Sequence, residues 1–354
     1  MRLHGGQLPP FLQPSLRSRP QELSPSAEGD SRAKCEGEAR CEGGGGSRHG
    51  GFLLPLLLLL SACVAPEQTV IPVPADTTAR AVVEVARFRD ARALAADPAG
   101  RLYVVDAAEA VVVVLTPEGA RLQTFGGPGS GDYGLLEPSG VDPTNGLEWF
   151  VADAGNARLQ RLSHDGRLIE TIPVPAGEPR AVGQPEPGRL PRGEPEGGLR
   201  GRPVAVAAGP AETLYAVEAE RGVVLQWEGR RLARILGADG PNALAEPNDL
   251  AVASDGALFV ADRAREAVLV YSSLGVFRRA VPGEAAGGVR AVGLARGPEG
   301  ARLLVVGPRA VAVHRAEGGL VEVVPVAVVE ELVDAAVAAG RLYVLTPTRL
   351  LRVE

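Results

Sequence analysis

An internal repeat runs through most of the sequence and constrains its fold more than any other feature. Each unit has an apolar strand, a glycine-containing turn, a second apolar strand that usually ends in an acidic residue, and a third apolar strand. Successive second strands start 47, 65, 44, 45 and 39 residues apart. A repeat of this length is one unit of several short strands, stacked against its neighbours. The second strands are 102–106, 149–153, 214–218, 258–262, 303–307 and 342–346.

Six such units predict an all-β, six-bladed β-propeller over residues 79–354, since four strands and about 45 residues are typical of one blade. The first strands are rich in alanine and valine, which suits the crowded inner strand of a blade, and Asp-Pro and Asp-Gly pairs form the turns. The last unit ends one strand short at Glu354, whereas an extra apolar strand, 79–88, precedes the first unit. We expect this N-terminal strand to complete the last blade and close the ring.

The segment before the propeller is predicted to be an export signal. Residues 1–50 have no apolar periodicity and are expected to form a disordered leader. A tract of this length before the basic part of a signal is unusual, which suggests that translation begins further along the chain. Residues 51–62 contain the apolar run 52–60, which is too short to cross a bilayer as a helix but fits a secretory signal. Residues 63–78 are then a tether.

The apolar run ends in Leu60-Ser61-Ala62-Cys63, which resembles a bacterial lipobox. In that family the cysteine thiol is acylated and the signal is cleaved just before it. The resemblance implies that Cys63 is the N-terminus of the mature chain and is anchored in a membrane, because several acyl chains hold a protein there stably. Val64 in place of Asp implies the outer membrane, if the cell has two. An ordinary cleavage site with an incidental cysteine is the alternative.

Two repeats resemble those of the NHL-repeat propellers. The resemblance implies the same fold over about residues 80–354. It does not imply one function, because propellers include enzymes, receptors and scaffolds. The similar segments are 137–143 with 150–162, 246–252 with 259–263, and 125–131.

Acidic residues recur at the ends of four second strands, at 106, 153, 218 and 262. Recurrence favours a structural role, in which the carboxylate accepts backbone N–H bonds or pairs with a nearby arginine; a direct ligand role is the alternative.

In propellers these ends share a face with the connections between blades, here the 127–136 loop and the insertion 173–202, and such loops commonly bind partners. The insertion is alternatively a surface excursion without a partner. The candidate ligand or partner face comprises Asp106, Asp132, Tyr133, Asp153, Asn156, Arg158, Asn248, Asp249, Asp262 and Arg263.

Residue types that support catalysis are scarce, with three Cys and four His in the chain. His164 is expected in a hairpin turn and His314 on a strand surface, without a second zinc ligand or a nucleophile beside them. Asn248-Asp249 resembles the gluconolactonase-like propellers, in which an asparagine and carboxylates of the inner strands hold a divalent cation. Only Asp334 offers a further carboxylate at such a position. We therefore assign no catalytic, cofactor or metal-binding residue.

These observations predict an exported binding or scaffolding module of the cell envelope, anchored in the membrane through acylated Cys63, with a protein, peptide or glycan partner and no enzymatic activity. The alternative is a divalent-cation-dependent hydrolase or lactonase of the gluconolactonase-like class. A formal charge of −6 gives no support for nucleic-acid binding. Without residues 1–62 the chain has 30 basic residues, all arginine, against 37 acidic ones.

Overall fold

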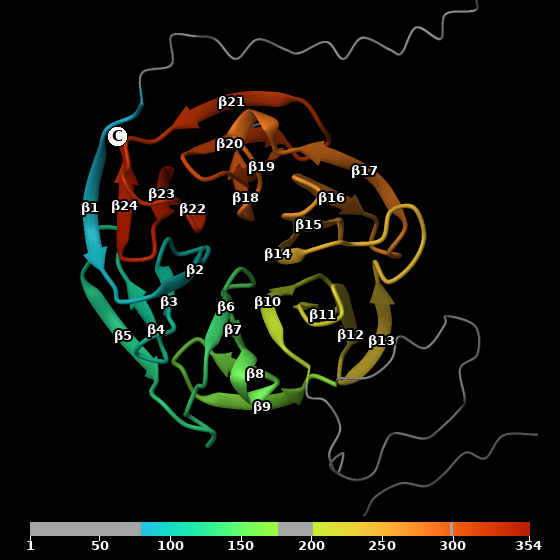
Figure 1. The fold of residues 1–354 in the computed structure, drawn as a ribbon. Coiled ribbons are helices and arrows are strands. Elements are labelled where there is room, and N and C mark those ends of the chain that lie inside the picture. The colour runs from blue at the N-terminus through green and yellow to red at the C-terminus, as the bar shows by residue number, and fades with distance from the viewer. Residues whose placement is uncertain (1–78, 176–200, 298–299) are drawn as a thin grey trace, which may run out of the picture. The chain divides into compact units, whose positions relative to one another are not determined.

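A ring of six blades forms the part of the chain that the structure describes. The structure is a computed structural model, and it describes residues 79–175, 201–297 and 300–354. Within them, six four-stranded antiparallel sheets surround a central axis, so the prediction of an all-β, six-bladed propeller is confirmed (Figure 1). The leader 1–50, the signal segment 51–62, Cys63 with the tether 63–78, and residues 176–200 of the insertion lie outside the described residues.

Each blade runs from an inner strand at the axis to an outer strand at the rim. In the first three blades, in this order, the strands are β2 (Ala91–Ala96), β3 (Leu102–Asp106), β4 (Val111–Leu115), β5 (Arg121–Gly126); β6 (Pro138–Asp142), β7 (Glu148–Asp153), β8 (Arg158–Ser163), β9 (Leu168–Pro173); and β10 (Pro203–Ala208), β11 (Thr213–Glu218), β12 (Val223–Glu228), β13 (Arg231–Leu236). In the last three they are β14 (Pro247–Val252), β15 (Leu258–Asp262), β16 (Ala267–Tyr271), β17 (Phe277–Pro282); β18 (Ala291–Gly297), β19 (Gly300–Val306), β20 (Ala310–Arg315), β21 (Leu320–Pro325); and β22 (Asp334–Ala338), β23 (Arg341–Leu345), β24 (Arg349–Val353), β1 (Val82–Arg87).

The N-terminal strand closes the ring, as predicted. Strand β1 is the outer strand of blade six and pairs antiparallel with β24, the last strand of the chain, with Val82 opposite Val353. The amide of Glu354 also donates to the carbonyl of Ala81 at 3.0 Å. The two ends of the described propeller therefore lie side by side at the rim (Figure 1).

The hydrophobic core is divided among the six seams between neighbouring blades, with one buried cluster in each. Because successive side chains of a strand point to opposite faces, the second strand of each blade serves two seams. In β3, Leu102 packs towards blade six and Tyr103 towards blade two. The Tyr103 ring lies 5.6 Å from that of Trp149, which also meets Phe125 edge to face at 5.3 Å.

The strand ends form two distinct faces of the ring. The turns between second and third strands and the connections between blades lie at one end, which we call the connection face. The other hairpin turns lie at the opposite end, which we call the hairpin face. No helix in the described ranges is long and apolar enough to cross a membrane.

Candidate functional site

The inner strands carry polar side chains around the central channel because their first turn is irregular. In blades one to four, one residue near the start of the inner strand is bulged out of its ladder with the second strand. A proline, which has no N–H to donate, directly precedes three of these bulges. The bulged Ser139 donates to the carbonyl of Pro203 at 3.0 Å, and the bulged Asn248 donates to that of Arg290. The bulges therefore connect neighbouring blades at the channel.

A cavity of about 160 Å³ lies in the channel, and three carboxyl groups line it, those of Asp142, Asp249 and Asp334. Asp249 of blade four accepts the N–H of Val292 in blade five at 2.9 Å. Asp334 of blade six accepts the N–H of Leu94 in blade one at 2.6 Å. The second oxygen of each of these two carboxyls accepts the N–H of the next residue in its own strand. Each carboxylate thus joins two inner strands.

The surroundings of these two groups favour their protonated forms. Burial raises the pKa of Asp249 to about 7, against the opposing effect of its backbone hydrogen bonds. Burial, followed by the negative charge of Asp249, raises the pKa of Asp334 well above its usual range. The burial of Asp249 therefore favours its protonated form at pH values at which an ordinary carboxyl group is ionised.

Asp142 connects blades two and three in the same way. The residues around it in the sequence do not predict this contact. Its carboxylate accepts the N–H of Ala208 at 2.5 Å, and burial raises its pKa. Within the described residues, such carboxylate bonds between inner strands occur at alternate seams: two to three, four to five and six to one. Asp97 stands in the same Asp-Pro turn context but pairs with Arg101 instead. Turn chemistry alone therefore does not distinguish the two aspartates.

The acidic ends of the second strands bind the connections between blades. Asp106 accepts the N–H groups of Arg89 and Asp90, at 2.9 and 3.1 Å. Glu218 and Asp262 accept N–H bonds from the connections that enter their own blades, and all three carboxylates are buried. These bonds hold the connections in place, which is the structural role that their recurrence favours.

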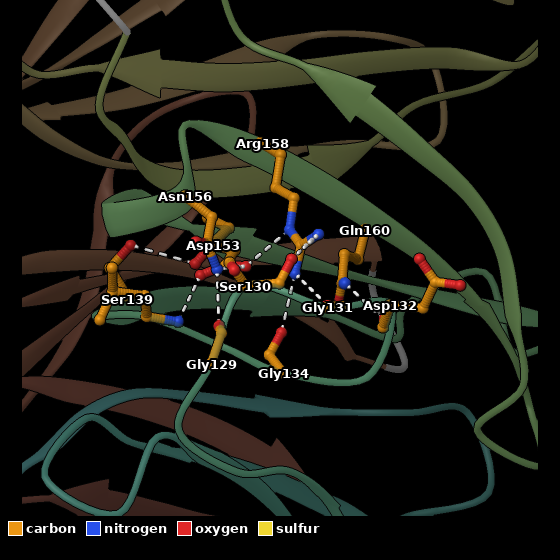
Figure 2. Close-up of polar contacts among 12 residues, drawn as sticks. Gly129, Ser130, Gly131, Asp132, Gly134, Ser139, Asp153, Asn156, Arg158 and Gln160 are labelled. Atoms are coloured by element: carbon orange, nitrogen blue, oxygen red, sulfur yellow. Dashed lines mark hydrogen bonds and ion pairs between the residues drawn. The ribbon is translucent and has the colours of Figure 1, made fainter.

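Blade two builds the most extensive polar network of the connection face, beneath the 127–136 loop (Figure 2). The completely buried Asp153 accepts the N–H of Leu136 at 2.7 Å and the Nε–H of Arg158 at 2.8 Å. Three side chains of the blade then donate to five carbonyl oxygens of the loop. These bonds run from Arg158 to Ser130 at 3.2 Å and to Gly131 and Gly134 at 2.8 Å, from Asn156 to Gly129 at 3.0 Å, and from Gln160 to Asp132 at 2.8 Å.

The loop held in this way displays side chains of three kinds. Tyr133 is 57% exposed, and Leu136 and Asp132 are also exposed. The ring of Phe125 meets the Tyr133 ring edge to face, with centroids 6.1 Å apart, and so supports it from below. An aromatic, an aliphatic and a carboxylate group therefore stand on a loop whose backbone is fixed.

The structure separates the ten predicted face residues rather than gathering them into one site. Asn248 and Asp249 line the channel, whereas Arg263 is exposed on the connection face, 3.9 Å from Glu246. The remaining residues lie in three blades. Asp106 belongs to blade one and Asp262 to blade four. The blade two network and its loop contain Asp132, Tyr133, Asp153, Asn156 and Arg158.

Neither histidine of the propeller has a metal-binding neighbourhood in the described part of the chain, where no three His, Cys, Asp or Glu lie close enough to hold a metal ion. His164 lies in a hairpin turn and is exposed. The prediction that His314 lies on a strand surface is wrong: it is buried between blades four and five, and its Nε2 has no hydrogen-bond partner among the described residues. Burial and the charge of Arg279 lower the pKa of His314.

Comparison with known proteins identifies the fold and leaves the family open. No protein-family model matches the chain, and no curated protein does, so the NHL resemblance stays a prediction. A streptogramin B lyase structure is similar over 77% of this chain and 97% of its own, with a TM-score of 0.52 and 11% identity. A luciferin-regenerating enzyme is similar over 77% of this chain and 94% of its own, with a TM-score of 0.53 and 14% identity. At these identities the likeness concerns the propeller fold alone.

Proposed function

We propose that this chain is a non-enzymatic binding module of the cell envelope, held in the membrane through acylated Cys63, and that the 127–136 loop is the centre of its binding surface. A protein, peptide or glycan is the partner. The sequence supports the anchor through the lipobox-like residues 60–63 that directly follow an apolar run.

One observation carries the binding role: five carbonyl oxygens of the loop are bound by side chains of blade two. Binding normally requires that a mobile loop lose conformational freedom, which weakens affinity. A loop that is already fixed avoids most of that loss. Because Tyr133 and Leu136 are exposed on this fixed backbone, they can enter a partner surface as anchors.

The experiment removes the two anchors without touching the network below them. In membranes of the producing cell, the Tyr133→Ser/Leu136→Ser variant and the wild type are chemically crosslinked, purified and compared by mass spectrometry and glycan analysis. We expect a partner that the wild type retains and the double variant loses at least tenfold. Leu147→Ser is the matched control, because Leu147 is 78% exposed but lies in a turn of the hairpin face. Equal recovery from all three proteins would refute the proposal.

The anchor is tested separately by the intact mass of protein extracted from membranes. We expect residues 1–62 to be absent and acyl mass to be present on Cys63. Unmodified protein that retains the leader would exclude the anchor and leave the loop proposal untouched.

A second candidate is the divalent-cation-dependent hydrolase, which one observation favours: Asp249 and Asp334 line the same cavity as Asn248. The fit to a cation is incomplete. All four carboxyl oxygens already accept backbone N–H bonds, and no group of three ligating residues exists in the described ranges. We therefore derive no reaction step from it. A rise in the melting temperature with Ca²⁺ or Zn²⁺ that Asp249→Asn abolishes would favour this candidate.

A further inference from the structure

A groove of about 410 Å³ opens at the rim of the propeller, where blade six meets blade one. The end of β1 and the strand β5 form its sides, and these two strands follow each other around the rim in Figure 1. Arg87, Arg89 and Arg121 line the groove, together with Thr124 and the carboxylates of Asp106 and Glu109. Asp106 is buried and bound to backbone N–H groups. Three guanidinium groups around one groove are suited to phosphate, because each offers a planar fork of N–H donors.

The arginines of the groove are available to a ligand. The side chain of Arg121 is exposed, and its guanidinium has no ion-pair or hydrogen-bond partner among the described residues. Arg87 pairs with Glu84 at 2.6 Å and Arg89 with Glu109 at 2.8 Å, but the two arginine side chains remain 76% and 78% exposed. Ion pairs as exposed as these are weak. A phosphate group can therefore compete with the glutamates for the same N–H donors.

The same two strands also carry exposed aliphatic side chains. Val83 on β1 and Leu122 on β5 are both exposed, Leu122 to 55%. Arginine and aliphatic side chains on one surface are the composition that favours the boundary between lipid headgroups and acyl chains. A small soluble anion would bind the arginines but would make no favourable contact with the aliphatic side chains.

The groove also lies on the strand that follows the anchor. Strand β1 is the first strand of the propeller, and the described chain starts only three residues before it. Residues 63–78, at about 3.3–3.6 Å per residue when fully extended, reach no more than about 60 Å. An acylated Cys63 therefore keeps the start of β1 within about 60 Å of the membrane.

We propose that this surface, the β1–β5 rim (Val83, Arg87, Arg89, Arg121 and Leu122), rests on an anionic phospholipid membrane, with the arginines bound to headgroup phosphates. The proposal rests on the proposed anchor for the nearness of the membrane, but the rim itself can be tested without it. The propeller would then stand on its edge, and the connection face would be open to a partner from the side.

The first experiment uses the purified Cys63→Ala chain, which has no acyl anchor. Its binding to vesicles of phosphatidylcholine, with and without one quarter phosphatidylglycerol, is measured by sedimentation at 50 and 300 mM NaCl. We expect binding to the anionic vesicles that salt weakens, and a loss of at least tenfold in Arg89→Glu/Arg121→Glu. Arg231→Glu/Arg278→Glu, which reverses the charge of two exposed arginines on the rims of blades three and four, is the control and should bind like the parent. Equal loss in both double variants, or no preference for anionic vesicles, would overturn the proposal.

The second experiment measures the orientation of the anchored protein. Lipidated protein is reconstituted in the anionic vesicles with a fluorophore on Leu122→Cys or, as control, on Val276→Cys, which is 62% exposed in blade four. When Cys63 is acylated, the introduced thiol is the only free one in the mature chain. We expect nitroxide-labelled headgroups to quench the label at 122 at least twofold more than that at 276. Equal quenching at the two positions would refute the proposal that the rim rests on the membrane. An intact mass that shows unmodified Cys63 would refute only the anchor.

Discussion

The guanidinium of Arg158 donates to the carboxylate of Asp153 at 2.8 Å, and both groups are buried beneath the 127–136 loop. The same guanidinium also binds three loop carbonyls. Asp153 thus fixes the arginine, and the arginine fixes the loop. Loss of either partner would leave a buried charge or several buried carbonyls unpaired.

We predict that Arg158→Leu lowers the free energy of unfolding by about 3 kcal/mol, because removal of one partner leaves the buried carboxylate of Asp153 uncompensated. Urea denaturation measures this change. Limited proteolysis should cleave the variant within 127–136 under conditions in which the wild type resists, since the loop loses three of its hydrogen bonds.

Arg263→Leu is the control for this substitution. Arg263 is exposed and lies 3.9 Å from Glu246, also exposed, so its removal should change stability by no more than about 0.5 kcal/mol. Equal destabilisation by both substitutions would contradict the role given to Arg158.

Gly140 tests how closely the inner strands approach each other. A Cβ at this position would lie 2.9 Å from the Cα of Ala205 and 3.2 Å from the carbonyl oxygen of Val204, both in the next blade. We expect Gly140→Ala to destabilise the propeller by about 1–3 kcal/mol, because backbone must move to admit the methyl group. Gly131→Ala, where a Cβ meets nothing within 4 Å, should leave the melting temperature within error. A neutral Gly140→Ala would show that the blades can separate freely.

The sequence was sufficient to predict the blades and the closure of the ring, because both depend on local signals. Apolar runs separated by turn residues recur in every unit, Asp-Pro or Asp-Gly pairs mark turns of units one, two and four, and the strand before Ala91 is left without a unit of its own. Closure followed from the count of strands. The resemblance to gluconolactonase-like propellers drew attention to Asp249 and Asp334 on the inner strands, but the third carboxyl group of their cavity, Asp142, was missed. Its place in the cavity depends on where the ring brings distant inner strands, which no local pattern reports.

The burial of His314 shows a second limit: alternating polarity along a strand does not always predict which of its side chains are exposed. Alternating polarity reveals the exposed face of a strand only if one face meets water. Strand β20 packs against blade four through Ala312 and against blade six through Val311, so it has no exposed face. A polar residue in such a strand is buried on either side.

The channel carboxyls predict a dependence of stability on pH. Burial raises the pKa of Asp249 to about 7 in the folded state, above the ordinary value of 3.8. Between these values the folded chain holds more protons than the unfolded one, so the free energy of unfolding falls as pH rises from about 4 to 7. Asp249→Asn should flatten this slope, whereas Asp132→Asn, at an exposed carboxylate, should not. Urea denaturation at several pH values measures both, and an unchanged slope in Asp249→Asn would contradict the burial of a titrating group there.

His314 predicts the opposite slope in part of the same range. Burial and the charge of Arg279 lower its pKa below the ordinary value of 6.5. When pH falls below that value, the unfolded state takes up a proton that the folded state resists, so His314 reduces stability progressively towards pH 5. His314→Leu should remove this acid loss, and its curve should rise relative to the wild type as pH falls from 7 to 5. His164→Gln, at the exposed turn histidine, should run parallel to the wild type. If the His314→Leu and wild-type curves were parallel over this range, the histidine would have to reach solvent in the folded state, and the seam between blades four and five would be open there.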